Sequence, residues 1–398
     1  MQLSELTSAE CRNLLKQVHY MVMTFDPHEA ARISGYWNWR FMLRFLVWCE
    51  SAMATDPRTA LPYALAAPEF AQNWANCEPA KQKAWARYYV RSYAVRATAL
   101  RIQGDFRGAD IAYRHGDHLL MLHSVVISSQ DISEYYRRAA KLWLYQGLFE
   151  KAEADARFAQ QAALALRRAD RARCHASLGE VYLYASIEQD DECLKGSVAK
   201  NREEAGYHLN EAIRLLDARV DPIILEAAVL NLAGLSAQAL EETQRLSLLQ
   251  RINDTRSQIS KRRQKITIAV NKFDWMRALA HISVGDLKQG RRILWNCKKR
   301  FDKFGMLDHA VAVLLDLAAL EAETGNLVAL RKHVEDVVPL IGQFDDVRRR
   351  EASALRKWCR DCLEQNDPDR EALCSLRSSL GLLPAIDFRT VDQVKKLA

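Results

Sequence analysis

Residues 104–113 read GDFRGADIAY, and this stretch decides the fold because its pattern recurs along the chain. Gly104 follows Ala97 by seven residues and precedes Ala109 by five. Glycine ends a helix readily because it accepts a positive φ angle. The small alanines on either side allow two antiparallel helices to pack closely. The stretch therefore predicts a joint between two packed helices.

The same joint occurs at three further glycines, each of which follows an alanine by seven residues. The glycines are Gly147, Gly285 and Gly325, and the alanines are Ala140, Ala278 and Ala318. Two looser copies place Gly179 and Ala233 at the small position. Successive small positions are 39 to 54 residues apart, and this recurrence predicts a protein built from stacked helix pairs.

The composition favours helix throughout the chain. Only 15 glycines and 9 prolines occur among 398 residues, and these residue types mark loops and helix ends. The good helix formers Ala, Leu, Arg and Glu are abundant, and 49% of the residues are hydrophobic, which is enough for a full core. We therefore predict an all-α fold.

Several segments resemble tetratricopeptide (TPR) repeats of the long-repeat bacterial regulatory type. They are DPRTALPYALAAPEFAQ at 56–72, RATALRIQGDFRGADIAY at 96–113, DPIILEAAVLNLAG at 221–234 and FDKFGMLDHAVAVLLDLAALEAETGN at 301–326. The resemblance implies a right-handed TPR-like α-solenoid with about six helix pairs at 79–344. Residues 1–78 are expected to form an N-terminal helical cap, and residues 345–398 a C-terminal helical cap and tail.

The resemblance also implies a function, because TPR arrays serve as interaction surfaces. The first hypothesis is a non-catalytic scaffold or regulatory adaptor for a protein partner, such as a sigma-type regulator or a protease of antiviral defence. A second hypothesis is a sensor of a signalling peptide or nucleotide. A third is a nucleic-acid binder that uses basic helix faces, among them SKRRQK at 260–265. The sequence does not choose among these partners.

Charge and cysteine content predict a cytoplasmic protein. The net charge is +7, a mild excess that suits an acidic partner. The chain begins MQLSELTSAECRNLLKQ, which has charges where the apolar core of a signal peptide is required. Nine cysteines, an odd number, are typical of reduced thiols rather than of a disulfide framework. No membrane attachment is predicted.

Catalytic and metal-binding motifs are missing from the sequence. It contains no GxxxxGK[ST] loop, no HExxH and no GxSxG, so we predict neither an enzyme nor a cofactor. Cys359 and Cys362 form a single CxxC without a second pair, and structural thiols are the favoured interpretation. His115 and His118 lie one turn apart, but no matching ligand pair accompanies them, so no metal is predicted.

The expected binding surface is the concave groove, which the first helix of each pair lines. Counting from the small positions predicts that the amino-terminal half of this groove is basic and the other half apolar. Arginine suits carboxylates because its fork binds them bidentately, so we expect a partner with an acidic segment. The alternative is that these residues are ordinary solvated faces. The candidates are Arg91, Arg101, Arg137, Lys141, Arg173, Lys272 and Trp275.

A second candidate surface is YWNWRFMLRFLVW at 36–48, which is too short to span a membrane. Trp37, Arg40, Arg44 and Trp48 recur there at spacings of three and four, which places them on one side of a helix. Stacking of arginine on tryptophan is expected in such a patch. The favoured alternative is a helix buried against its neighbours.

Overall fold

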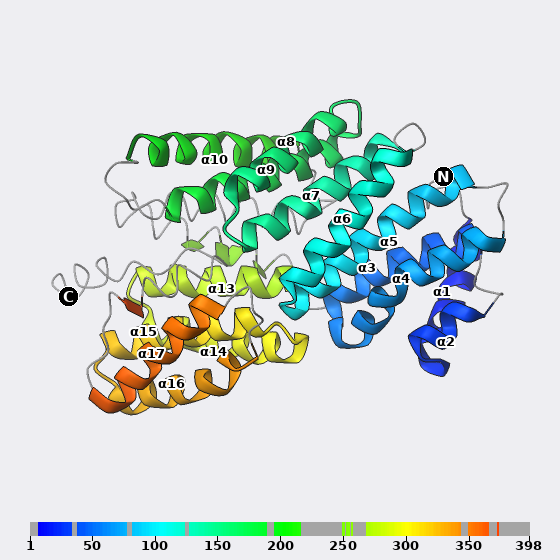
Figure 1. Ribbon diagram of the computed structural model, residues 1–398. Helices are drawn as coiled ribbons and strands as arrows, with labels where there is room; N and C mark the ends of the chain where they lie inside the picture. The colour runs from blue at the N-terminus through cyan, green and yellow to red at the C-terminus, as the bar shows by residue number, and fades with distance from the viewer. Residues whose placement is uncertain are drawn as a thin grey trace. The chain divides into compact units, whose positions relative to one another are not determined.

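A computed structural model describes residues 7–33, 38–77, 82–123, 127–188, 195–215, 249–250, 252–254, 256–257, 268–343, 349–365 and 372–373. Every labelled element is an α-helix (Figure 1), and the predicted all-α fold is confirmed. The chain divides into two compact units, Met1–Leu142 and Trp143–Ala398. Within the described ranges, none of the helices is both long and apolar enough to cross a membrane.

The first unit begins with helices that precede the predicted repeats. Helix α3 packs on α1, α4 and α5, while α2 packs on α4 and α5 packs on α6 (Figure 1). The division between the units falls in the last turn of α7. The helices are α1 (Ser8–Thr24), α2 (Pro27–Arg32), α3 (Trp39–Thr55), α4 (Pro57–Cys77), α5 (Gln82–Gln103), α6 (Phe106–His123) and α7 (Ser129–Tyr145).

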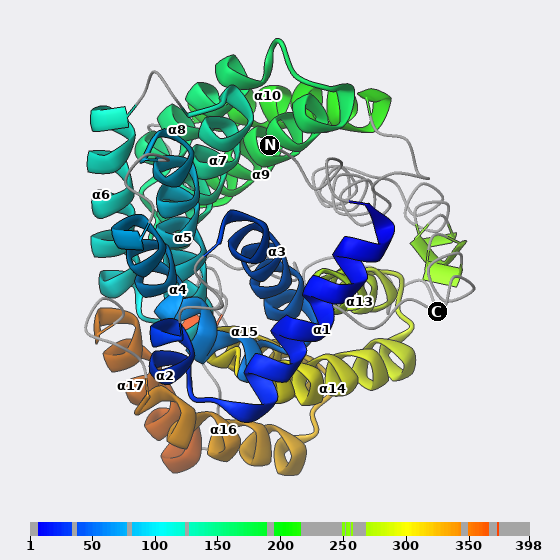
Figure 2. The same cartoon turned by 90° about the vertical axis from the view of Figure 1, so that its right-hand side faces the viewer.

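The second unit contains further helix pairs. Helix α9 packs along α10, α13 along α14, and α15 along α16 (Figure 2). Helix α8 contacts α9, and α17 covers α16. The bounds are α8 (Phe149–Ala163), α9 (Arg168–Glu188), α10 (Lys195–Leu215), α13 (Ile268–Ser283), α14 (Leu287–Phe304), α15 (Leu307–Glu323), α16 (Leu327–Ile341) and α17 (Arg349–Gln365).

The predicted joints have the expected backbone conformation. Gly104, Gly147, Gly285 and Gly325 all have positive φ angles, between 71° and 87°. At the joint after α5, the Gly104 N–H donates to Arg101 O and the Asp105 N–H donates to Leu100 O, at 3.2 and 3.0 Å. This pair of bonds satisfies carbonyls that the helix end leaves without partners. The Asp105 carboxylate then accepts from the Gly108 N–H and begins α6.

The predicted small positions are packing sites. Ala97, Ala140, Ala278 and Ala318 are all fully buried. Gly179 lies on α9 against α10, where an added Cβ would approach Leu209 Cγ to 2.6 Å. The absence of a side chain at Gly179 therefore allows α9 and α10 to approach closely. The sixth small position, Ala233, lies outside the described residues.

We predict that the substitution Ala140→Leu lowers the free energy of unfolding by about 1–3 kcal/mol, because overpacking displaces neighbouring side chains. Ala140 is fully buried on α7, so a larger side chain has no access to solvent. Chemical denaturation followed by circular dichroism measures the change. Unchanged stability would show that Ala140 is not a contact position of the repeat.

The limits of the two predicted caps stay predictions. Residues 78–81 and 344–348, which contain both proposed boundaries, lie outside the described residues.

Candidate functional site

Five charged side chains from three helices of the first unit form one network, which we call the charged cluster. Its members are Glu50 on α3, Arg91 on α5, and Glu134, Arg137 and Arg138 on α7. Two of them, Arg91 and Arg137, are predicted groove residues. The cluster therefore joins the first helices of two successive pairs to a helix that precedes the repeats.

The Glu50 carboxylate is the centre of the charged cluster. Arg91 binds it bidentately, with Nε to Oε1 at 2.9 Å and Nη2 to Oε2 at 2.7 Å. Arg138 adds an ion pair from Nη2 to Oε1 at 3.0 Å. Arg138 and Arg137 in turn donate to Glu134, at distances of 2.7 to 3.0 Å. Bidentate, charge-assisted hydrogen bonds of this kind are strong and geometrically specific.

Burial and charge act in opposite directions on the two carboxylates of the cluster. Burial raises the pKa of Glu50, but the positive charges of Arg138 and Arg91 outweigh it and hold that pKa below the ordinary value. The pKa of Glu134 is likewise held well below its ordinary range, because Arg137 and Arg138 outweigh its burial. Both carboxylates are therefore ionised at neutral pH. With three arginines and two glutamates, the cluster carries a net charge of +1.

The remaining basic candidates also hold interactions within the chain. Arg101 and Lys141 are half-buried and have internal contacts. Arg173 pairs with Asp170 at 3.2 Å. Lys272 Nζ donates to Tyr145 Oη at 2.5 Å and lies 5.1 Å from the centre of that ring. Of the predicted groove residues, Arg91 and Arg137 are thus the two that belong to the charged cluster.

Trp275 is a core residue and not the accessible apolar anchor that the groove counting predicts. Its side chain is fully buried. The indole Nε1 donates to Asp316 Oδ2 at 2.6 Å, and the ring packs edge-on against Phe301 and His309. Trp275 is inaccessible because α14 and α15 cover α13 at this position, so its side chain packs in the core.

Helix α3 buries seven side chains, but the second candidate surface lies on its other side, where Arg40 is exposed and Arg44 and Trp48 are half-buried. Trp48 packs on Tyr63, with ring centres 6.0 Å apart, and Arg40 lies over Trp39 and pairs with Glu10 at 3.1 Å. Arg44 is half-buried. Trp37 lies outside the described residues.

The cysteines and histidines that the sequence singles out do not assemble into a metal site in the described ranges. Cys359 and Cys362 are both buried on α17. Burial, with a smaller effect of Cys362, raises the pKa of Cys359 to about 12, so its thiol stays protonated at neutral pH. The His115 ring packs against Tyr93, with centres 5.5 Å apart. Among the described residues, no three potential ligands cluster.

A pair of histidines that the sequence analysis did not identify lies between α9 and α10. His175 Nδ1 and His208 Nδ1 are 2.9 Å apart, so one ring must donate to the other. His208 also stacks on Tyr182, with the ring planes 7° from parallel. Burial, and then the charges of His175 and Arg157, lower the pKa of His208 to about 4. Burial also lowers the pKa of His175.

We predict that this pair destabilises the protein in acid. Unfolded histidine binds a proton near pH 6.5, whereas folded His208 does so only near pH 4. The unfolded state therefore binds more protons in this interval, and stability falls as the pH drops through it. Urea denaturation between pH 7.5 and 4.5 should show a shallower decline for His208→Gln than for the natural chain. Equal slopes would contradict the prediction.

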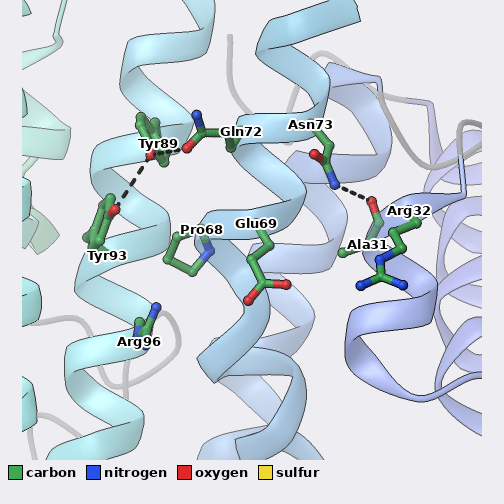
Figure 3. A pocket seen from close by; sticks show the side chains of 9 residues that line it. All are labelled: Ala31, Arg32, Pro68, Glu69, Gln72, Asn73, Tyr89, Tyr93 and Arg96. Carbon is green, nitrogen blue, oxygen red and sulfur yellow. Dashed lines mark hydrogen bonds between the residues drawn. The ribbon is translucent and has the colours of Figure 1, made fainter.

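The first unit also contains a pocket of about 350 Å³ between α2, α4 and α5 (Figure 3). Most of its lining is polar. The Tyr89 hydroxyl donates to Gln72 Oε1 at 2.6 Å and lies 3.5 Å from the Tyr93 hydroxyl. On the opposite side, Asn73 Nδ2 donates to the carbonyl of Ala31 at 2.7 Å. The lining consists of Ala31, Arg32, Pro68, Glu69, Gln72, Asn73, Tyr89, Tyr93 and Arg96.

Comparison with known proteins identifies the fold. No protein-family model matches the chain, and no curated protein matches its sequence. Among solved structures, it is similar to a Rap protein crystallised in complex with competence and sporulation factor, with a TM-score of 0.57 and 10% sequence identity. The match covers 89% of this chain and 89% of that one. At this identity the likeness shows the fold, which is an all-α solenoid of TPR-like helical repeats.

Proposed function

We propose that this protein is a non-catalytic interaction scaffold or regulatory adaptor, and that it binds an acidic segment of a protein partner at the charged cluster. One observation carries the proposal: Arg91 and Arg138 already hold a helix-borne carboxylate, that of Glu50, in bidentate and ion-pair geometry. Glu50 is thus a chemical model for an acidic side chain of the partner.

The charged cluster retains access for such a segment. The side chains of Arg91, Arg137 and Glu134 are 23%, 26% and 33% exposed, so the cluster is neither in the core nor fully solvated. Its net positive charge attracts a carboxylate, and partial burial reduces screening by salt. Arg101, on the same helix as Arg91, and Lys141, on the same helix as Arg137, belong to the same proposed surface. Exposed charge pairs contribute about 0.2–1 kcal/mol each, so several must act together.

The similar solved structure supports a binding role, because that Rap protein was crystallised with a second molecule, competence and sporulation factor. A fold of stacked helix pairs offers a long surface for such partners. A sigma-type regulator or a protease of antiviral defence remains our proposal for the partner, and the cytoplasm remains the proposed location.

We predict that reversing two charges, Arg137→Glu with Lys141→Glu, abolishes capture of the partner while helix content is retained. The natural chain and the variant are used as baits for affinity capture, and binding of the captured protein is then measured by calorimetry at low and high salt. Because the interaction is electrostatic, the difference between the two chains should shrink as salt rises.

The control is a second double reversal, Arg292→Glu with Lys299→Glu, on exposed positions of α14. It changes the net charge equally, far along the sequence from the charged cluster, and should leave binding intact. Normal binding by the Arg137 and Lys141 variant would contradict the proposed site. Equal loss in both variants would indicate a general effect of charge.

A further inference from the structure

The pocket between α2, α4 and α5 is lined by charges of both signs, which come from all three helices (Figure 3). Arg32 and Arg96 reach it from α2 and α5, and in the described parts of the chain neither forms an ion pair with a carboxylate. Glu69 comes from α4 and lies between them in this view. Its Oε2 bonds to His28 Nδ1 at 2.9 Å.

Gln72 and Asn73, which adjoin on α4, each keep one polar group that bonds to no other described residue. Gln72 uses Oε1 to accept from the Tyr89 hydroxyl, which leaves its Nε2 group to donate. Asn73 uses Nδ2 to donate to the Ala31 carbonyl, which leaves its Oδ1 to accept. This pair complements a peptide group, which has one N–H and one C=O. Beside it the rings of Tyr89 and Tyr93, with centres 5.2 Å apart, form an aromatic wall.

We propose that this pocket binds a small zwitterion of the amino-acid or dipeptide class. The α-carboxylate binds Arg96, the α-ammonium binds Glu69, and a peptide group bonds to Gln72 and Asn73. A volume of about 350 Å³ suits a dipeptide better than a protein segment. The Glu69 carboxylate in the pocket lining favours a ligand with both charges over a phosphate ester, whose dianion it would repel. The inference does not depend on the proposed function.

Isothermal titration calorimetry of the full chain with the dipeptide Gly-Phe tests the proposal. Its phenyl ring can pack on Tyr89 and Tyr93, its carboxylate can bind Arg96, and its ammonium group can bind Glu69. We expect a Kd below about 1 mM, and binding at least tenfold weaker for the doubly blocked peptide N-acetyl-Gly-Phe-amide. The variants Arg96→Gln and Glu69→Gln should each weaken Gly-Phe at least tenfold. Arg107→Gln, at an exposed position of α6, is the control and should bind normally.

Singly blocked peptides separate recognition from loss of structure. N-acetyl-Gly-Phe has no ammonium group, so Glu69→Gln should not weaken it further. Gly-Phe-amide has no carboxylate, so Arg96→Gln should not weaken it further. A variant that weakens all four peptides equally contradicts the assigned contacts. The proposal is overturned if no amino acid or dipeptide binds, or if adenosine monophosphate binds and Glu69→Gln strengthens it, since that result identifies a phosphate ligand.

Discussion

Replacing Trp275 with alanine is expected to lower the free energy of unfolding by about 3–5 kcal/mol, the range for deleting a large buried aromatic side chain. The ring is fully buried between α13, α14 and α15, and it packs against Phe301 and His309. Alanine leaves a cavity there and removes the hydrogen bond that Asp316 receives from the indole. The loss combines a packing effect with the removal of a buried polar contact.

Urea denaturation followed by tryptophan fluorescence and circular dichroism measures this effect. Trp295→Ala is a matched control, because Trp295 on α14 is only half-buried and packs against His333. Its stability loss should be clearly smaller. The experiment also separates two interpretations of Trp275: a partner-binding residue on an exposed face would weaken capture without changing stability, whereas a core residue changes stability first. An unchanged unfolding curve would contradict the core position.

Replacing Glu50 with glutamine is expected to destabilise the protein by about 2–3 kcal/mol, because two arginines lose the carboxylate that they share. The estimate lies below the range for fully buried pairs, since the Glu50 side chain is 19% exposed. Glutamine keeps the size of the side chain but removes its charge. Arg91 loses its bidentate partner, whereas Arg138 keeps Glu134.

The pH dependence of this difference provides a second readout. The pKa of folded Glu50 is lowered, so its contribution is present above the unfolded carboxyl pKa of about 4.3 and is lost as the pH falls through the folded value. The gap between the natural chain and Glu50→Gln should therefore be full at pH 7 and shrink in acid. Glu150→Gln, at an exposed position of α8, should change stability little at either pH. A pH-independent gap would argue against an ionic cause.

Local sequence predicts the helix joints of this protein because the forces that form them act over a few residues. Gly104 adopts a positive φ of 87°, as its position between two helical segments requires. The alanine seven residues earlier is fully buried, as the recurrence of small side chains predicts. The contact between Arg137 and Glu134 is similarly local, since residues three apart meet on a helix surface.

The charged cluster and the pocket depend on contacts between helices that are far apart in sequence. Arg91 meets Glu50 across 41 residues, and Asn73 meets Ala31 across 42. No spacing rule relates such positions, so the repeat pattern that predicts Arg91 as a groove residue does not predict its contact with Glu50. Trp275 shows the same limit, because the sequence pattern of an apolar helix face is the same whether that face meets solvent or another helix.

The sequence by itself determined the all-α repeat architecture, the positive-φ joints and the buried small positions. Each of these rests on backbone conformation or on packing between helices that adjoin along the chain. Only the tertiary structure decided which charges are neutralised, which aromatic rings are buried and where a cavity remains. Those properties depend on how α2 and α3 pack against α4 and α5 and on how α14 and α15 cover α13. Burial and ion pairing depend on distance in space and not on separation in sequence.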